Sequence, residues 1–200
     1  MRSDRSSQSG VSLLELLVVL FLIGLLTSMA CDTLIRMARR AALRSAAVTL
    51  ANVMQRVQFD SYGNSSMRGL RFSQTASGWQ YAVYEDADGD GVLNADILAG
   101  VDPLVEGPFP LADRLSIARI GVPPSSVPHP DTGAPFPSTI KAVNFNQSSI
   151  CSFAPDGDAT PGTIYLVNGS RGEAAMVRSS GAGGRIRAMF YGLRGSGWQP

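Results

Sequence analysis

The stretch from Gly10 to Ala30 constrains this chain most, because it is almost entirely apolar over the length of a membrane span. A helix of about 20 apolar residues crosses the roughly 30 Å hydrocarbon core of a bilayer. One acid, Glu15, lies near the start of the stretch, and a polar leader with Arg2 and Arg5 precedes it. A charged carboxylate inside such a segment costs at least about 2.5 kcal/mol, so its presence indicates a function.

Gly10, Val11 and Glu15, at this spacing beside an apolar run, resemble the type III signal of type IV pilins and pseudopilins. The resemblance implies that a prepilin peptidase cuts between Gly10 and Val11 and methylates the new amine. It also implies that Glu15 meets the mature amine of a neighbouring subunit in a filament, where the pair removes two uncompensated charges from an apolar core. The chain departs from the family at Val11, where phenylalanine is usual, and at Asp32, where proline is frequent.

Three other interpretations of the stretch stay open: an uncleaved signal anchor, a lipoprotein signal ending at Cys31, and an ordinary secretory signal. A lipoprotein signal would have a leucine-like residue three before Cys31, where this chain has Ser28. A secretory signal has an apolar region of about 7–15 residues, which is shorter than this one. The spacing of Gly10 and Glu15 therefore favours the pilin-type signal.

The arginines around the stretch conflict with the resemblance over orientation. Arg36, Arg39, Arg40 and Arg44 follow the stretch, whereas Arg2 and Arg5 precede it. The positive-inside rule would then place the C-terminal flank in the cytoplasm. The resemblance implies a single-pass protein of the bacterial inner membrane with its C-terminal domain in the periplasm, and we expect that orientation.

About 170 residues follow the apolar stretch, which suits one domain. Residues Leu43, Ala46, Ala47, Leu50, Val53, Met54 and Val57 form one apolar stripe at helical spacing. Short runs rich in Val, Ile, Tyr and Phe follow, separated by Gly and Pro, and predict β-strands. These runs are Leu70–Phe72, Trp79–Tyr84, Leu115–Ile120, Ile140–Phe145, Thr163–Val167, Ala174–Val177 and Arg185–Phe190.

The expected fold is therefore α+β: a long N-terminal transmembrane helix packed on a C-terminal antiparallel β-sheet or sandwich. We predict a leader over residues 1–10, a transmembrane and filament-core helix over 11–31, an amphipathic helix over 32–62 and a β domain over 63–200. The proline-dense segment 121–138 should be irregular, and residues 181–184 should form a turn.

Four downstream pieces in this order resemble the GspH/FimT family of minor pseudopilins. They are Gly78–Tyr84 (GWQYAVY), Glu85–Gly91 (EDADGDG), Phe153–Gly157 (FAPDG) and Gly184–Arg187 (GRIR). The resemblance implies a structural subunit of a type II secretion pseudopilus, with the prepilin peptidase and other pseudopilins as partners. The alternative is a FimT-like minor pilin of a type IV pilus that binds DNA during uptake.

Asp86, Asp88 and Asp90 alternate with small residues and precede Gly91, as in the first half of a calcium loop. The bidentate acid of that motif would stand at Ile97, so the motif is incomplete. The alternatives are a soluble Asp/Gly turn without a cofactor and a partial calcium site.

Arginines concentrate at the C-terminal end, where Tyr191 and Trp198 also lie. Arginines and exposed rings can bind single-stranded nucleic acid, and relatives that take up DNA use arginines near the C-terminus. The alternative is that these arginines point to solvent from a strand whose other face is core. The candidate DNA-binding residues are Arg178, Arg185, Arg187 and Arg194.

The remaining reactive residues indicate no catalytic site. There is one histidine, His129, between two prolines, where a loop residue is expected. Cys31 and Cys151 are expected to be too far apart for a disulfide. The sequence has no P-loop and no Gly-rich nucleotide fingerprint, so we predict a non-catalytic protein.

Overall fold

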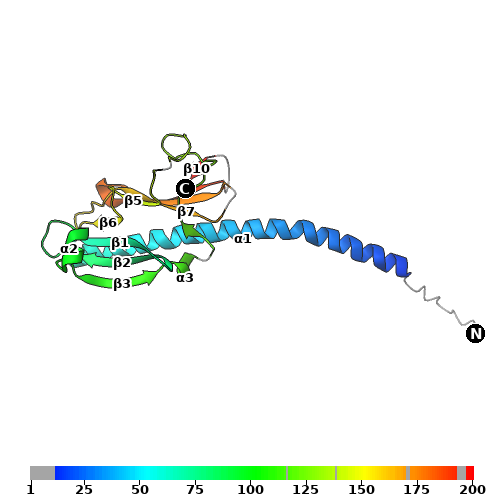
Figure 1. The fold of residues 1–200 in the computed structure, drawn as a ribbon, viewed down its shortest axis with the longest axis horizontal. Helices are drawn as coiled ribbons and strands as arrows, with labels where there is room; N and C mark the ends of the chain where they lie inside the picture. Colours follow the sequence, from blue (N-terminus) through cyan, green and yellow to red (C-terminus); the bar gives the residue numbers. More distant parts are fainter. Residues whose placement is uncertain (1–11, 116, 138, 170–171, 193–196) are drawn as a thin grey trace, which may run out of the picture. The chain divides into compact units, whose positions relative to one another are not determined.

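The structure is a computed structural model that describes residues 12–115, 117–137, 139–169, 172–192 and 197–200 (Figure 1). The chain divides into two compact units between Ala38 and Arg39, called here the N-terminal unit and the C-terminal unit. The predicted leader, residues 1–10, lies outside the described residues.

Helix α1 (Leu13–Asn64) is 52 residues long and takes up both predicted helical segments. No proline occurs in it, and a side chain at its internal Gly24 would meet no other atom. The predicted limit between residues 31 and 32 therefore falls inside one helix. The helix ends two residues beyond the predicted position 62, where Ser65 takes a left-handed φ of 52°.

The C-terminal unit is an antiparallel β structure of two sheets with short helices between strands (Figure 1). One sheet has the order β3-β2-β1-β6, and the other has the order β10-β9-β8-β7-β4, with β5 also pairing with β7. The strands are β1 (Arg68–Thr75), β2 (Gly78–Glu85), β3 (Leu104–Pro110), β4 (Arg119–Ile120), β5 (Val143–Phe145), β6 (Ile150–Phe153), β7 (Gly162–Val167), β8 (Ala174–Ser179), β9 (Ile186–Tyr191) and β10 (Trp198–Gln199). The helices are α2 (Asn94–Ala99), α3 (Ala112–Leu115) and a 3-10 turn at Ala182–Gly184.

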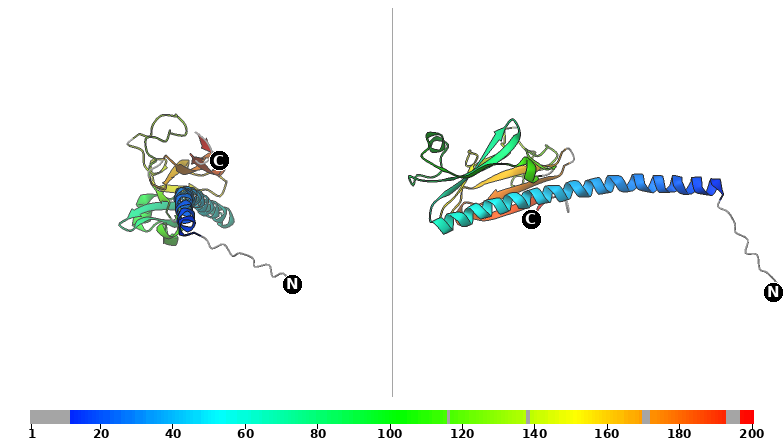
Figure 2. Two further views of the ribbon diagram at one scale, coloured as in Figure 1. Left: turned by 90° about the vertical axis from the view of Figure 1, so that its right-hand side faces the viewer. Right: turned by 90° about the horizontal axis from the view of Figure 1, so that it is seen from below.

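The main core joins the predicted helical stripe to both sheets. Leu43, Leu50, Met54 and Val57 are fully buried, and they share one cluster with residues of β1, β2, β7 and β8. Figure 2 shows the part of α1 that carries this stripe running along the strands. The α+β fold, with a long helix packed on antiparallel sheets, is confirmed.

A second, smaller core covers the other face of β7 and β8. Tyr165 and Met176 point to this face, while their neighbours Ile164 and Val177 belong to the main core. The cover is the proline-dense segment 121–138, which contributes Val127 and Phe136. The Phe136 and Tyr165 rings meet edge to face with centroids 5.1 Å apart.

Two predicted strands are shorter than expected. Within Leu115–Ile120, α3 ends at Leu115 and only Arg119–Ile120 pairs, because the amides of Arg114 and Leu115 bond back to Leu111 in a helical turn. Within Ile140–Phe145, only Val143–Phe145 is a strand.

The strand β3, at the edge of its sheet, was not predicted because Gly107-Pro108 is typical of a turn. A strand at the edge of a sheet tolerates proline, because a residue whose amide side faces solvent donates no hydrogen bond to a neighbouring strand. Strands β6 and β10 and helix α2 were also missed. The predicted turn at 181–184 is present as the 3-10 turn, and segment 121–138 contains no strand that enters either sheet.

Candidate functional site

The first half of α1 exposes an apolar surface. From Leu13 to Leu26, every described large aliphatic side chain is exposed, as is Phe21. This helix is long and apolar enough to cross a membrane. Between Leu13 and Ser28 there are two hydroxyl residues, and both donate to the helix backbone: Thr27 to the Ile23 carbonyl at 2.7 Å and Ser28 to the Leu25 carbonyl at 2.8 Å. The segment therefore presents almost no free polar group to its surroundings, as a membrane or a filament core requires.

Glu15 is the exception, and it lies in the first turn of α1. The turn begins with the bond from the Leu16 amide to the Ser12 carbonyl at 3.1 Å. Within the described residues, no salt bridge involves Glu15. The predicted cleavage pair, Gly10 and Val11, lies outside those residues. The apolar stretch 13–26 of α1 thus carries one carboxylate, with no cationic partner in the described chain, on an exposed surface.

A sequence model for the prokaryotic N-terminal methylation motif matches residues 5–30. The motif indicates a type IV pilin-like protein. In general it implies a structural subunit rather than an enzyme, processing by a prepilin peptidase, and assembly with other pilins. No curated protein and no solved structure matches this chain. The apolar helix fits the inner-membrane anchor of such a protein.

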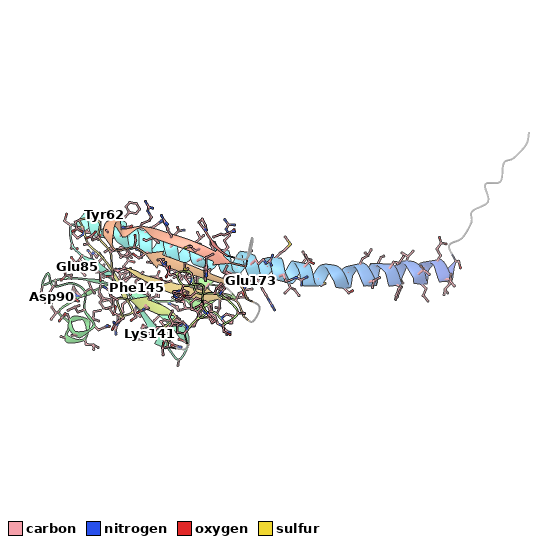
Figure 3. The ribbon with its side chains drawn as sticks, turned by 90° about the horizontal axis from the view of Figure 1, so that it is seen from above. Tyr62, Glu85, Asp90, Lys141, Phe145 and Glu173 are labelled. Atoms are coloured by element: carbon pink, nitrogen blue, oxygen red, sulfur yellow. The ribbon has the colours of Figure 1, made fainter. Side chains whose placement is uncertain are left out.

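The acidic run of this pilin-like protein lies in the connection between β2 and β3. Figure 3 shows Glu85 and Asp90, which flank the run, at the same end of the C-terminal unit as Tyr62. Asp86 accepts hydrogen bonds from the Gly89 amide at 2.7 Å and from the Gly91 amide at 3.1 Å. These bonds fold the run into a tight turn directly after β2.

The structure brings Asp86 and Asp88 together with Asp102, and Asp90 is not part of this cluster. One carboxylate oxygen of each of the three lies within 4.8 Å of the others. Asp90 is exposed, and desolvation together with the charges of Asp88 and Asp96 raises its pKa. Asp102 was not identified from the sequence, because its position bears no fixed spacing to the turn. Ile97, at the position of the missing EF-hand ligand, lies in α2.

Three of the four candidate DNA-binding arginines lie together. Arg178, Arg185 and Arg187 line one hollow of about 400 Å³ beside the turn before β9. Arg185, directly before β9, and Arg187, within β9, are exposed, while Phe190 of β9 is buried. Arg194 lies outside the described residues.

Arg178 already has a partner in the same chain. Its guanidinium donates to both oxygens of Asp131, at 2.7 and 2.8 Å, and its Nε donates to Thr163 at 3.3 Å. These bonds lower the pKa of Asp131. The pair joins segment 121–138 to β8, which makes Arg178 a clamp on the second core. Asp131 was not singled out in the sequence.

The C-terminal aromatics are also engaged within the chain. Trp198 Nε1 donates to the Pro128 carbonyl at 2.7 Å, and its ring lies 5.8 Å from the Tyr191 ring. Both side chains are half-buried and pack on the second core. These contacts favour the alternative in which the two rings belong to the core rather than to an exposed basic surface.

Two arginines of α1 pair with acids of the same chain. Arg40 reaches Glu173 at 2.7 Å and Arg56 reaches Glu106 at 2.7 Å. The second pair lowers the pKa of Glu106, chiefly through the bonds from Arg56. Both contacts lie in the C-terminal unit and fix the outer half of α1 to the sheets.

The remaining reactive residues are placed as predicted. Cys31 and Cys151 are both free thiols, the first exposed and the second buried. Burial raises the pKa of Cys151, so its thiol stays protonated. His129 lies in the loop, with its ring 5.2 Å from Phe136 and its Nδ1 3.9 Å from Asp131.

Proposed function

We propose that this pilin-like protein is a minor pseudopilin of the GspH/FimT type that acts in a type II secretion system. The observation that carries the proposal is the methylation motif, combined with Glu15 in the first turn of an exposed apolar helix. The four sequence pieces from Gly78 to Arg187 support the subfamily. The mature chain would begin at Val11, and the C-terminal unit would form the periplasmic surface of the pseudopilus.

Glu15 has a structural role in this proposal. An ionised carboxylate on an apolar helix is costly in lipid or in a filament core unless a cation meets it. The methylated amine of Val11 in the next subunit would supply that cation. Pairing would then occur only when subunits stack in one register, so a single ion pair would select the correct assembly.

The N-terminus tests the processing step. Mass spectrometry of the protein from its native membrane should find a chain that starts at methylated Val11. A chain that begins at Met1, or a lipid-modified chain that begins at Cys31, would contradict the proposal. Glu15→Ala should still be cut but should fail to crosslink with other pseudopilins. Thr27→Ala, in the same helix, should crosslink as the wild type does.

Loss of the gene should stop protein secretion and leave pili and DNA uptake intact. The converse phenotype would favour a FimT-like minor pilin. One observation supports that second candidate: Arg185 and Arg187 are exposed at one hollow. Gel retardation of single-stranded DNA by the full chain in detergent should then weaken in the Arg185→Ala/Arg187→Ala double variant. Arg119→Ala, which removes an exposed arginine from β4, is the matched control. Equal retardation by all forms would remove the DNA-binding candidate.

A further inference from the structure

The connection between β2 and β3 begins and ends with acids that the fold brings together. Asp86 follows the last residue of β2, and Asp102 precedes β3 by two residues. The two ends are held side by side, because the Glu85 amide donates to the Pro103 carbonyl at 3.1 Å. Asp86 is also fixed through its amide, which donates to the Met67 carbonyl at 3.1 Å. The acids therefore meet at the base of the connection, on anchored backbone.

Asp102 is the unusual member of this cluster. It is only 2% exposed, and its Oδ2 accepts the Leu93 amide at 3.0 Å. Its Oδ1 is buried and has no hydrogen-bond partner among the residues that the structure describes. A buried carboxylate oxygen without a donor or a cation is costly. The fold thus holds an unsatisfied anionic oxygen close to two further carboxylates.

No cationic side chain of the described chain neutralises the cluster. The segment from Glu85 to Glu106 contains seven acids and no lysine or arginine. Arg68, which is buried nearby, pairs with Glu85 at 2.9 Å instead. Within the described residues, Asp86, Asp88 and Asp102 take part in no salt bridge. The described residues therefore leave the negative charge of the cluster without a counter-charge.

We propose that the base of the β2–β3 connection binds one calcium ion through Asp86, Asp88 and Asp102. Calcium takes oxygen ligands at about 2.3–2.6 Å, so two ligands of one ion are at most about 5 Å apart. The 4.8 Å limit on the three oxygens falls within this range. Magnesium demands a near-octahedral shell at about 2.0–2.1 Å and usually keeps several waters, so a site made of three side-chain carboxylates suits calcium better.

The ion would close the connection at its base. It would join the residue after β2 to the residues before β3, and so fix the segment that carries α2. That segment exposes Leu98, Leu93 and Val101, which makes it an apolar surface on a charged loop. Calcium binding would therefore hold this apolar surface in one conformation.

The test measures calcium binding to the full chain in detergent by isothermal titration calorimetry, after EGTA treatment. We expect one site per chain with a Kd of about 1 mM or tighter. Asp88→Asn, at an exposed position, and Asp102→Asn should each weaken binding about tenfold or more. Asp113→Asn removes the same charge from exposed α3 and should bind as the wild type does. Asp90→Asn should change the affinity less than Asp88→Asn does.

The proposal would be overturned if the wild type did not bind calcium at about 10 mM, or if it bound magnesium equally tightly. Unchanged calcium affinity in Asp88→Asn would also overturn it, as would equal losses of affinity in Asp113→Asn and Asp88→Asn. A larger loss of calcium affinity in Asp90→Asn than in Asp102→Asn would mean that the ligands are those of the sequence motif, and it would also contradict the proposal. Circular dichroism of each variant in EGTA checks folding. If Asp102→Asn does not fold, the exposed Asp88→Asn decides the outcome.

Discussion

The two halves of α1 both carry apolar side chains, but these side chains lie in opposite environments. Leu13, Leu20 and Leu26 of the first half are exposed, whereas Leu50 and Met54 of the second half are fully buried. The second half meets two sheets of its own chain, so its apolar stripe is satisfied within one molecule. The first half has no such cover in the described structure and depends on lipid or on other subunits. In the proposed function, one continuous helix thus combines an assembly element with a folding element.

The strongest test of this contrast is the same substitution in both halves. Leu50→Ala should lower the free energy of unfolding of the C-terminal unit by about 3 kcal/mol, because it opens a cavity in the main core. Leu20→Ala should leave that free energy unchanged, since Leu20 touches no core residue. Urea unfolding of the full chain in detergent, followed by far-ultraviolet circular dichroism, measures both. Equal losses of unfolding free energy would mean that both halves of α1 contribute equally to the stability of the C-terminal unit.

The two cysteines probe the same contrast through reactivity. The C151S variant keeps Cys31, which should react readily with a small maleimide in the folded protein. The C31S variant keeps buried Cys151, and its reaction should be about 100-fold slower or more, because the thiol must wait for an opening of the fold. Urea should bring the two rates together. A fast reaction of Cys151 without denaturant would contradict the burial of β6 in the main core.

The contrast also explains how much of the molecule the sequence predicts. An unbroken apolar helix and a stripe at helical spacing depend on neighbours a few residues away, so α1, its core residues and Glu15 were predictable. The continuous apolar runs of β7 and β8 indicate strands buried on both faces. These runs do not indicate which segment packs on the second face, and in the structure that segment is 121–138.

The pairs that were missed join residues that are far apart in the sequence. Arg178 pairs with Asp131, 47 residues away, and Trp198 pairs with Pro128, 70 residues away. Asp102 meets Asp86 only once β3 has paired with β2. The sequence motif instead indicated Asp90, which is adjacent in the chain but lies outside the cluster. Local pattern therefore identified the acidic turn and missed the residue that completes it.

Within the C-terminal unit, the main core and the second core can be compared by weakening one contact of the second core. Trp198→Phe keeps the ring but leaves the Pro128 carbonyl without its donor, so the free energy of unfolding should fall by about 1 kcal/mol. Trp79→Phe is a matched control because no described hydrogen bond involves its indole nitrogen. Urea unfolding compares the two variants. A loss no larger than that of Trp79→Phe would show that segment 121–138 is held by its apolar contacts alone.

The smallest expected effect is the pH dependence of the Asp131–Arg178 clamp. Arg178 lowers the pKa of Asp131 below its usual value of 3.8, so the folded state favours the ionised form. This stabilisation is complete above the unfolded pKa and disappears as the pH falls through the lower, folded pKa. Asp131 is half exposed, so solvent screening limits the contribution to roughly 0.5 kcal/mol.

Asp131→Asn should therefore reduce the unfolding free energy by a constant amount between about pH 8 and pH 5. The difference from the wild type should shrink as the pH falls below about 4, where the carboxylate of the unfolded wild type is also protonated. Asp113→Asn, at an exposed position on α3, should show no such trend. If the difference instead grew toward low pH, the folded state would stabilise the protonated form of Asp131, and folding would raise the pKa of Asp131 rather than lower it. The exposed half of α1 should show none of this dependence, because its two acids, Glu15 and Asp32, lie outside the unit whose unfolding is measured.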